Sequence, residues 1–308
     1  MNIEHKHYSN IIICTYNRAK SLRDTLEALM EQSLPDDVSA EVIVVDNNCS
    51  DETKSVIEDF TRHAKKIPIR YVFEIKQGIS FARNAGIKSA KGDFIIFTDD
   101  DVIPEKGWCF NLCEAYKKNP DVDIFGGPVR PLWEIKPARW LEDPELISYL
   151  ALVDYGDQII KKSAVTPNFL VGANFAFKKT VFDEIGNFVT RLGSVGCERY
   201  LGDDTDMMKR AFEAGKRAMY IPNALVHHKV PKERMKLKYF RHWWFRAGYS
   251  YVKLSVKFEK LEFWLLRECV QEALKYLICI VSFKAVQAIK AEKEFWYKCG
   301  MVSALWKR

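Results

Sequence analysis

The sequence predicts an α/β protein with a mostly parallel central sheet, and two of its features lead to that prediction. Short apolar runs of strand length alternate with segments of helical periodicity. The composition is that of a folded chain, since 48% of the 308 residues are hydrophobic and 29% are charged, whereas disordered chains are poorer in apolar residues. Strands that alternate with helices are joined by crossovers, and such connections give parallel sheets covered by helices on both faces.

The predicted elements follow one another in a regular order. Residues 10–14 are an apolar, β-branched run, and a helix follows because Leu22, Leu26, Leu29 and Met30 recur on one helical face. The unit then repeats, with strands at residues 41–45, 69–73 and 93–98 and with helices at residues 52–60 and at about 80–90.

Polar segments follow three of these strands. They occupy residues 15–18, 46–51 and 99–101. In open parallel sheets, ligands bind beyond the carboxyl ends of the strands. We therefore expect the three segments to converge on one crevice.

The run Asp99-Asp100-Asp101 is the sharpest local feature of the sequence. Three adjacent carboxylates repel one another unless a cation neutralises them, and in an extended segment Asp99 and Asp101 project to the same side. A hard divalent ion suits such a pair, with a diphosphate supplying further oxygen ligands. A solvated acidic turn before a helix is the alternative.

Two more polar clusters occur about a hundred residues later. The sequence GDDTD at residues 202–206 precedes a helical pattern, so it is either a helix N-terminus favoured by the helix dipole or the source of a general base. Residues 224–228 indicate an apolar strand that ends in His227 and His228. One of these imidazoles is a candidate metal ligand.

Taken together, these motifs closely resemble those of the bacterial family 2 glycosyltransferases, which have a GT-A fold. The resemblance extends over residues 9–230 and implies a Rossmann-like, nucleotide-sugar-binding catalytic domain. The matching motifs are CTYNR (14–18), VVDNNCSDET (44–53), QGISFARNAGIKSAKGDFIIFTDDD (77–101), GANFAF (172–177), GDDTD (202–206) and HH (227–228).

The resemblance implies which residues bind the nucleotide sugar. They come from the loop after the first strand, the end of the second strand, the ARN stretch, the DXD motif and the GANFAF motif. They are Thr15, Tyr16, Arg18, Asp46, Arg83, Asn84, Asp99, Asp100 and Asn174. Among them Asp46 would accept the imide N–H of uracil, which favours a UDP-sugar.

The resemblance assigns the metal ligands as well. Asp101 and Asp99, the two ends of the DXD motif, would bind Mn²⁺ or Mg²⁺. His227 and His228 are candidates for a further ligand. The cation would neutralise charge that develops on the departing nucleotide, as a Lewis acid does.

Asp204 is implied as the base that deprotonates the acceptor, and Asp203 is a neighbour that raises its pKa or orients it. Relatives more often have Glu at the position of Asp203. Single displacement at the anomeric carbon inverts its configuration, so an α-linked donor would give a β-linked product. The predicted activity is sugar transfer to a glycan or polyprenyl-linked acceptor in cell-surface polysaccharide biosynthesis. A sugar nucleotidyltransferase and an inactive GT-A binding module are the alternatives.

The stretch at residues 126–196 is rich in Pro, Gly and aromatic residues. Insertions after a DXD strand are where acceptor pockets and mobile lids form. Trp133 and Trp140 either stack on sugar rings there or serve as packing residues.

Charge divides the chain into two regions. Residues 232–308 contain 12 Lys and 5 Arg against 7 Glu, a net charge of +10, which leaves −4 for residues 1–231. We therefore predict a catalytic domain at residues 1–230 and a basic, aromatic, mostly helical region at residues 231–308. No nucleic-acid-binding motif is recognisable in this region, so nucleic acid is not an expected partner.

The C-terminal region either closes over the catalytic crevice or associates with an anionic membrane surface. An amphipathic helix is expected where apolar residues recur three or four positions apart. These residues are Leu261, Trp264, Leu265, Leu274, Leu277, Ile278 and Val281.

The eight cysteines form no CxxC pair, and the N-terminal residues lack the apolar core of a signal peptide. The longest apolar run of the C-terminal region, at residues 276–283, is far shorter than the ~20 residues that a spanning helix needs. We expect a cytoplasmic protein, peripheral at the inner face of the plasma membrane.

Overall fold

The computed structural model describes residues 7–166, 168–193, 201–254, 263–282 and 284–306. Its contacts divide the chain into two compact units. The first unit comprises Met1–Leu132, Ala151–Leu192 and Gly202–Lys229; the second comprises Trp133–Leu150, Gly193–Leu201 and Val230–Arg308. Two segments of the predicted catalytic domain, 133–150 and 193–201, thus belong to the second unit. The roles of the two regions stay a prediction.

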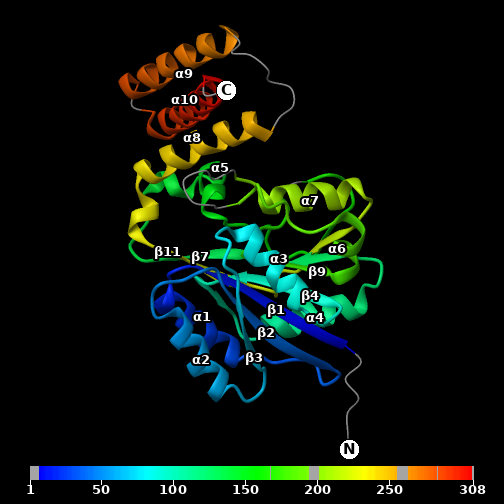
Figure 1. Cartoon of the computed structure of the whole chain (residues 1–308). Coiled ribbons are helices and arrows are strands. Elements are labelled where there is room, and N and C mark those ends of the chain that lie inside the picture. Colours follow the sequence, from blue (N-terminus) through cyan, green and yellow to red (C-terminus); the bar gives the residue numbers. More distant parts are fainter. Residues whose placement is uncertain (1–6, 167, 194–200, 255–262, 283, 307–308) are drawn as a thin grey trace, which may run out of the picture. The chain divides into compact units, whose positions relative to one another are not determined.

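The first unit is built on an eight-stranded sheet with the strand order β3-β2-β1-β4-β9-β6-β10-β8 (Figure 1). Strands β3, β2, β1 and β4 are parallel, whereas β9 is antiparallel to both β4 and β6. The predicted α/β class with a mostly parallel sheet is confirmed. The strands are β1 (His7–Thr15), β2 (Val38–Asp46), β3 (Ile69–Phe73), β4 (Phe94–Asp99), β6 (Ile124–Gly126), β8 (Ile160–Lys162), β9 (Asn174–Lys178) and β10 (Ala218–Tyr220).

Helices cover both faces of this sheet because the central strands have apolar side chains on both faces. Ile12 of β1 belongs to a core cluster that also contains Phe97 of β4 and residues of α3, α6 and α7. Figure 1 shows α1 and α2 on the opposite side. The helices of the first unit are α1 (Ala19–Met30), α2 (Thr53–His63), α3 (Ile79–Ser89), α4 (Trp108–Lys118), α6 (Lys179–Ile185) and α7 (Asp203–Glu213).

The carboxyl ends of β1, β2 and β4 meet at one edge of the sheet. Thr15 at the end of β1 is in register with Asp46 at the end of β2, and Cys14 is in register with Asp99 at the end of β4. The three polar segments that follow these strands therefore start side by side, as predicted.

A second, three-stranded sheet has the order β5-β11-β7. Its strands are β5 (Val102–Pro104), β7 (Val129–Trp133) and β11 (Val226–Val230). The prediction that an apolar strand ends at the histidines is wrong, because β11 begins at Val226 and continues through both of them. Side chains alternate across a strand, so His228 is buried and His227 is partly exposed.

The second unit contains three long helices, α8 (Leu237–Leu254), α9 (Phe263–Val281) and α10 (Ala285–Trp306), which confirms a helical C-terminal region. Helices α8 and α10 approach closely at two glycines. A Cβ atom on Gly248 would lie 1.8 Å from the carbonyl oxygen of Tyr297, and one on Gly300 would lie 1.9 Å from that of Phe245.

Shorter elements of the second unit are η1 (Arg139–Glu142), α5 (Pro144–Ile147), η2 (Ser148–Leu150) and η3 (Lys232–Met235). The ring of Trp140 packs against Phe240 at 4.9 Å between centroids, which agrees with the packing alternative for this residue. Residues 194–196 of the predicted acceptor insertion, and Leu261, lie outside the described residues.

None of the helices in the described ranges combines the length and the apolarity required to span a bilayer.

Candidate active site

The Asp99-Asp100-Asp101 run lies where β4 ends, and Arg18 from the loop after β1 binds two of its carboxylates. Arg18 Nη1 lies 3.0 Å from Asp100 Oδ1 and 2.8 Å from Asp101 Oδ2. The backbone oxygen of Asp100 accepts a hydrogen bond from Thr25 Oγ1 of α1. The loop predicted to bind the nucleotide therefore meets the acidic run directly.

His228 provides a second side-chain partner for this run. Its Nε2 lies 3.2 Å from Asp101 Oδ1, and both side chains are buried. The backbone N–H of Lys229 donates to the backbone oxygen of Asp101. His227 projects to the other face of β11, where its Nε2 lies 2.9 Å from Glu105 Oε1. The structure thus brings His228 to the acidic run, and not His227.

Burial affects the protonation of the acidic run. Desolvation raises the pKa of Asp100 to about 6, against the lowering influence of Arg18. Burial is also the main reason why the pKa of Asp99 is raised, with Arg83 acting in the opposite direction. An added positive charge near these buried carboxyl groups would stabilise their charged form.

Arg83 of α3 joins this acidic run to the second one. Its buried guanidinium is ion-paired with Asp203, and its Nη2 lies 4.0 Å from Asp99 Oδ1. The rings of Phe175 and Phe188 lie 5.4 and 5.1 Å from its guanidinium carbon. The two rings are neighbours, and a cation that lies against aromatic rings is stabilised by their π faces as well as by the carboxylates.

Asp203 and Asp204 begin α7, after Gly202 in a left-handed conformation with φ of 102°. Burial raises the pKa of Asp203 to about 6, and the adjacent Arg83 counteracts this. Asp204 Oδ1 accepts a hydrogen bond from the N–H of Thr205, and its Oδ2 accepts one from the N–H of Gly172 at 3.3 Å. The Asp204 carboxylate is thereby oriented by two backbone N–H groups, and that of Asp203 by Arg83.

Gly172 has a steric role in this arrangement. A Cβ atom at this position would lie 2.2 Å from Arg83 Nη2. Only glycine lets the backbone pass this close to the guanidinium while its N–H reaches Asp204.

Asp46, at the end of β2, is buried and firmly held. Its Oδ1 accepts a hydrogen bond from the N–H of Cys49 at 2.7 Å, and its Oδ2 accepts one from the hydroxyl of Tyr71 at 2.9 Å. Burial, together with this carboxylate, raises the pKa of the Tyr71 hydroxyl to about 12. Thr15 is buried beside Asp46, and Tyr16 is exposed.

The side chains of the two asparagines in the predicted site form hydrogen bonds with backbone groups. Asn84 exchanges two hydrogen bonds with the backbone of Phe188, at 2.8 and 3.0 Å. Asn174 accepts from Trp108 Nε1 and donates to the carbonyl oxygens of Pro128 and Ala224. Their contact with a nucleotide sugar stays a prediction.

Sequence reasoning did not identify Tyr71 or the two phenylalanines around Arg83. Tyr71 has no local signal beyond its place in β3, next to the strand that ends in Asp46. Phe175 lies within the motif GANFAF, so the sequence indicated that its segment belongs to the site but did not predict its contact with Arg83. Nothing in the sequence pairs Arg83 with Asp203, which lies 120 positions away.

The side chains at the acidic run include ligand types that a divalent cation accepts. Asp99 and Asp101 offer carboxylate oxygens and His228 offers an imidazole nitrogen, which are ligand types that Mn²⁺ accepts. Asp101 is paired with two basic side chains, so positive charge is already required there. In the part of the chain that the structure describes, no three acidic, His or Cys side chains stand together as a complete ligand set. Phosphate oxygens of a donor would therefore complete the coordination.

Three comparisons with known proteins agree with one another. A family model described as "Glycosyl transferase family 2" matches residues 10–186, more than half of the chain. The glucosyl-dolichyl phosphate glucuronosyltransferase of Haloferax volcanii is 29% identical over 249 residues, which cover 78% of this chain and 75% of that protein. Succinoglycan biosynthesis protein ExoM of Rhizobium meliloti is 28% identical over 246 residues, which cover 80% and 74% of the two chains.

Among solved structures, a mannosyltransferase from Pyrobaculum calidifontis in complex with GDP-Man and Mn²⁺ has a similar fold. The TM-score is 0.57 at 22% identity, and the match covers 97% of this chain and 74% of that one. With the family match, this likeness confirms the predicted GT-A fold.

Proposed function

The chain belongs to glycosyl transferase family 2 and is a glycosyltransferase, and on this premise we propose that it is an inverting, metal-dependent enzyme that uses a UDP-sugar. The acceptor in this proposal is a glycan or a polyprenyl-linked sugar of cell-surface polysaccharide biosynthesis. The names of two relatives, which refer to a dolichyl phosphate and to succinoglycan, support this acceptor class.

The observation that carries the proposal is the position of Arg83 between the two acidic clusters. One guanidinium contacts Asp203 and lies 4.0 Å from Asp99. This arrangement supports a donor site at the DXD motif and a base at the start of α7 that act on one sugar. A sugar nucleotidyltransferase has no need of the second cluster, and family membership also disfavours that alternative.

The donor's base is proposed to bind at Asp46. A carboxylate oxygen has two lone pairs, so the hydrogen bonds from Tyr71 and Cys49 leave Asp46 able to accept the imide N–H of uracil. These hydrogen bonds also fix the orientation of the Asp46 carboxylate, which favours a nucleotide base with an N–H donor facing it. Arg18 is positioned to attract the diphosphate.

Asp99, Asp101 and His228 are the residues that would hold Mn²⁺ or Mg²⁺. When bound, the ion supplies charge neutralisation for the diphosphate leaving group. In that role Asp101 would exchange its contact with Arg18, and the guanidinium would then be available to phosphate oxygens.

Asp204 is proposed as the base. It takes the proton of the acceptor hydroxyl while the acceptor oxygen forms a bond to the anomeric carbon. The bond from that carbon to the phosphate oxygen breaks, and the nucleoside diphosphate leaves with the electron pair. Gly172 and Thr205 hold the carboxylate through backbone N–H groups, and Arg83 keeps Asp203 from competing for the same position.

The assignment predicts that Asp204→Asn lowers turnover by about 10²–10⁴-fold, because general-base catalysis contributes on that order. Donor affinity, measured by calorimetry with Mn²⁺, should stay nearly unchanged. Asp206→Asn is the matched control, since Asp206 lies on the same helix and pairs with Arg210. A variant that keeps its turnover would show that the base lies elsewhere.

Product stereochemistry tests the inversion independently. We expect a β-linked product from an α-linked donor, read from the anomeric proton coupling in nuclear magnetic resonance spectra. A product that retains the donor's configuration contradicts the single displacement. Binding of donors without turnover of any would instead support the inactive binding module.

We also propose that the enzyme works in the cytoplasm, peripheral at the inner face of the plasma membrane. The seven cysteines that the structure describes are all free thiols, as in proteins of reducing compartments.

A further inference from the structure

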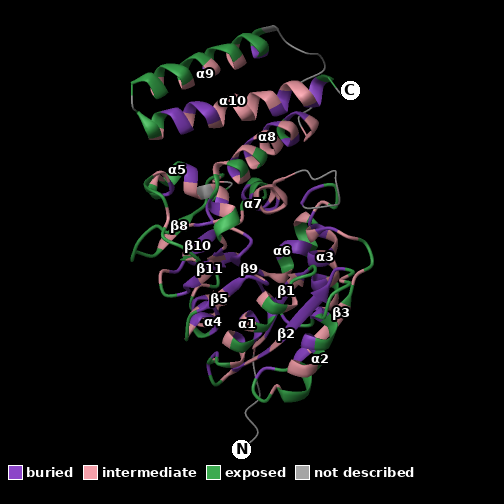
Figure 2. Cartoon of the chain, turned by 90° about the vertical axis from the view of Figure 1, so that its left-hand side faces the viewer, coloured by how far each residue is buried: buried purple, intermediate pink, exposed green. Residues whose placement is uncertain are grey.

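Helix α9 turns an apolar face outward from the second unit. Along it, apolar residues recur three or four positions apart and are exposed, as Figure 2 shows by the green colour along most of the helix. Ile278 is 64% exposed and Val281 is 78% exposed. The row consists of Leu266, Val270, Leu274, Leu277, Ile278 and Val281.

The opposite face of α9 carries its carboxylates, and these face α10. Glu272 is only 7% exposed. Lys298 Nζ of α10 lies 3.0 Å from Glu268 Oε2 and 3.5 Å from Glu272 Oε1, and Lys275 Nζ lies 2.7 Å from Glu272 Oε1. A surface helix in water has the reverse arrangement, with its apolar stripe inward. Ion pairs thus hold α9 with its apolar stripe outward.

The charges left on the outer side of α9 are positive. Arg267 is exposed on the helix and Lys284 is exposed just beyond its end, whereas Lys275 is paired with Glu272. Both carboxylates of α9 are neutralised by the lysines named above. An apolar stripe with cations and without free carboxylates complements an anionic lipid surface. A second copy of the chain would bring the same positive charges to the interface.

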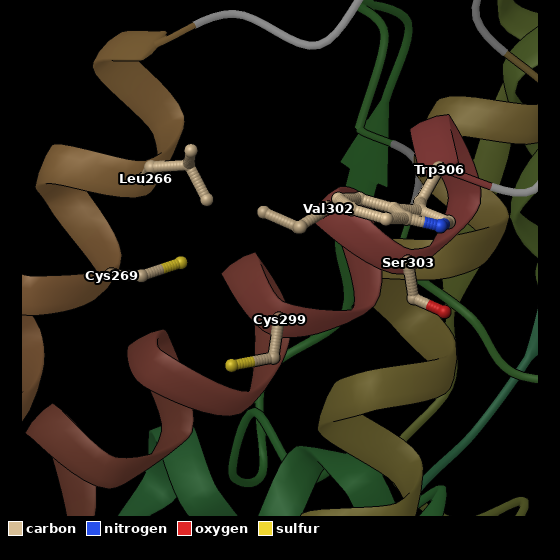
Figure 3. A pocket seen from close by; sticks show the side chains of 6 residues that line it. All are labelled: Leu266, Cys269, Cys299, Val302, Ser303 and Trp306. Carbon is tan, nitrogen blue, oxygen red and sulfur yellow. The ribbon is translucent and has the colours of Figure 1, made fainter.

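The apolar row continues into a groove between α9 and α10. The cavity has a volume of about 320 Å³ and is lined by Leu266, Cys269, Cys299, Val302, Ser303 and Trp306. In Figure 3, Leu266 and Cys269 from α9 face Val302 and Cys299 of α10 across this space. Trp306 at its edge is 80% exposed. Tryptophan is enriched at the level of lipid headgroups, where one side of the ring is apolar and the other is wet.

The dimensions of α9 suit a helix that lies in the interface. Its 19 residues span about 28 Å at a rise of 1.5 Å each. It carries four charged residues, which distinguishes it from a spanning segment.

From these observations we propose that α9 is a lipid-binding helix, which lies along an anionic membrane surface with its apolar row inserted and with the α9–α10 groove receiving a lipid hydrocarbon chain. The proposal rests on the second unit alone and is independent of the catalytic assignments. It gives the basic C-terminal region a defined point of contact.

The test is co-sedimentation of the full chain with vesicles of phosphatidylcholine alone and of phosphatidylcholine mixed with phosphatidylglycerol. We expect binding to the mixed vesicles at low salt, and weaker binding at high salt because the cations are screened. Leu274→Glu should weaken binding roughly tenfold or more, since it replaces a buried leucine by a charge in the bound state. Leu274 is 54% exposed in water, so the variant should fold.

Ile159→Glu is the matched control, because Ile159 is 60% exposed in the first unit and should not affect vesicle binding. Quenching of tryptophan fluorescence by brominated lipid gives a second measurement, and Trp306→Phe should reduce it. Equal binding of wild type and Leu274→Glu, or no binding to any vesicle, would overturn the proposal. So would a dimer in lipid-free solution that Leu274→Glu converts to a monomer, because the row would then be a protein interface. Turnover on a water-soluble acceptor, unaffected by Leu274→Glu, keeps this test separate from that of the catalytic function.

Discussion

At the scale of single residues, the site depends on charges that are buried together. The Arg83 side chain is buried and that of Asp203 is only 13% exposed, and each charge is acceptable there because the other is present. The two phenylalanine rings and the glycine beside Arg83 leave the guanidinium little freedom to move. We regard this pair as the part of the site most sensitive to substitution and to pH.

The pKa of Asp203 predicts an acid limb in the activity. Because burial raises this pKa from 3.8 to about 6, the carboxyl takes up a proton as the pH falls through about 6, where an ordinary aspartate is still charged. Protonation ends the ion pair with Arg83, so turnover should be full above this pH and decline below it. A pH profile of kcat/KM measures the limb.

Asp203→Asn provides the comparison for that profile. The variant lacks the titrating group, so its lower activity should no longer show the limb near pH 6. If the limb persists in Asp203→Asn, another group is responsible for it, and Asp100, whose pKa burial also raises to about 6, is the first candidate.

Other positions show which parts of the site sequence alone could predict. Asp99, Asp100 and Asp101 were placed correctly because parallel strands end at a common edge, a rule that needs only the strand pattern. His227 and His228 were indistinguishable, since their faces depend on where β11 begins. Asn174 donates hydrogen bonds to the backbone of two other segments. These are tertiary contacts, which the local sequence does not predict.

At the scale of elements, the strand and helix pattern of the first hundred residues was predicted well. Runs such as residues 10–14 and 41–45 are apolar on both faces, which is typical of strands buried in a parallel sheet. Segment 133–150 was harder to assign, because its short helices and loops have weak periodicity and pack with residues distant in the sequence. The orientation of α9 was also unpredictable, since a row of apolar residues indicates a face without saying which way it turns.

The crossing of α8 and α10 allows a stability prediction. Gly248→Ala would place a methyl group 1.8 Å from the carbonyl oxygen of Tyr297, so the helices must separate. Overpacking of this kind costs about 1–3 kcal/mol, which exceeds the roughly 1 kcal/mol that alanine gains over glycine in a helix. Thermal unfolding followed by circular dichroism should show a lower midpoint.

Gln287→Ala is the control for this substitution. Gln287 is exposed on α10, so its replacement should change stability by no more than about 0.5 kcal/mol. A Gly248→Ala variant as stable as Gln287→Ala would mean that the helices cross with more space than described.

At the scale of the whole molecule, donor and metal should stabilise the chain together. A ligand present at about 100 times its dissociation constant adds roughly 2.7 kcal/mol to the free energy of unfolding. We expect UDP to raise the melting temperature in the presence of Mn²⁺ and chelation to remove most of this shift. Asp101→Asn should abolish the metal-dependent part.

GDP provides the comparison nucleotide in the same experiment. A UDP-selective site at Asp46 should give a smaller shift with GDP. A larger shift with GDP would reassign the donor, and a metal-independent shift in the wild type would remove the metal from the site.

Arg83 also has a consequence for the order of events. In the proposed mechanism the same positive charge would serve a carboxylate on the donor side and one on the acceptor side, so a change in charge at Asp99 would alter the ion pair of Asp203. Occupancy of the two sides would then be thermodynamically linked, and such linkage is reciprocal. The two substrates should not bind independently: each should alter the other's apparent affinity by the same factor.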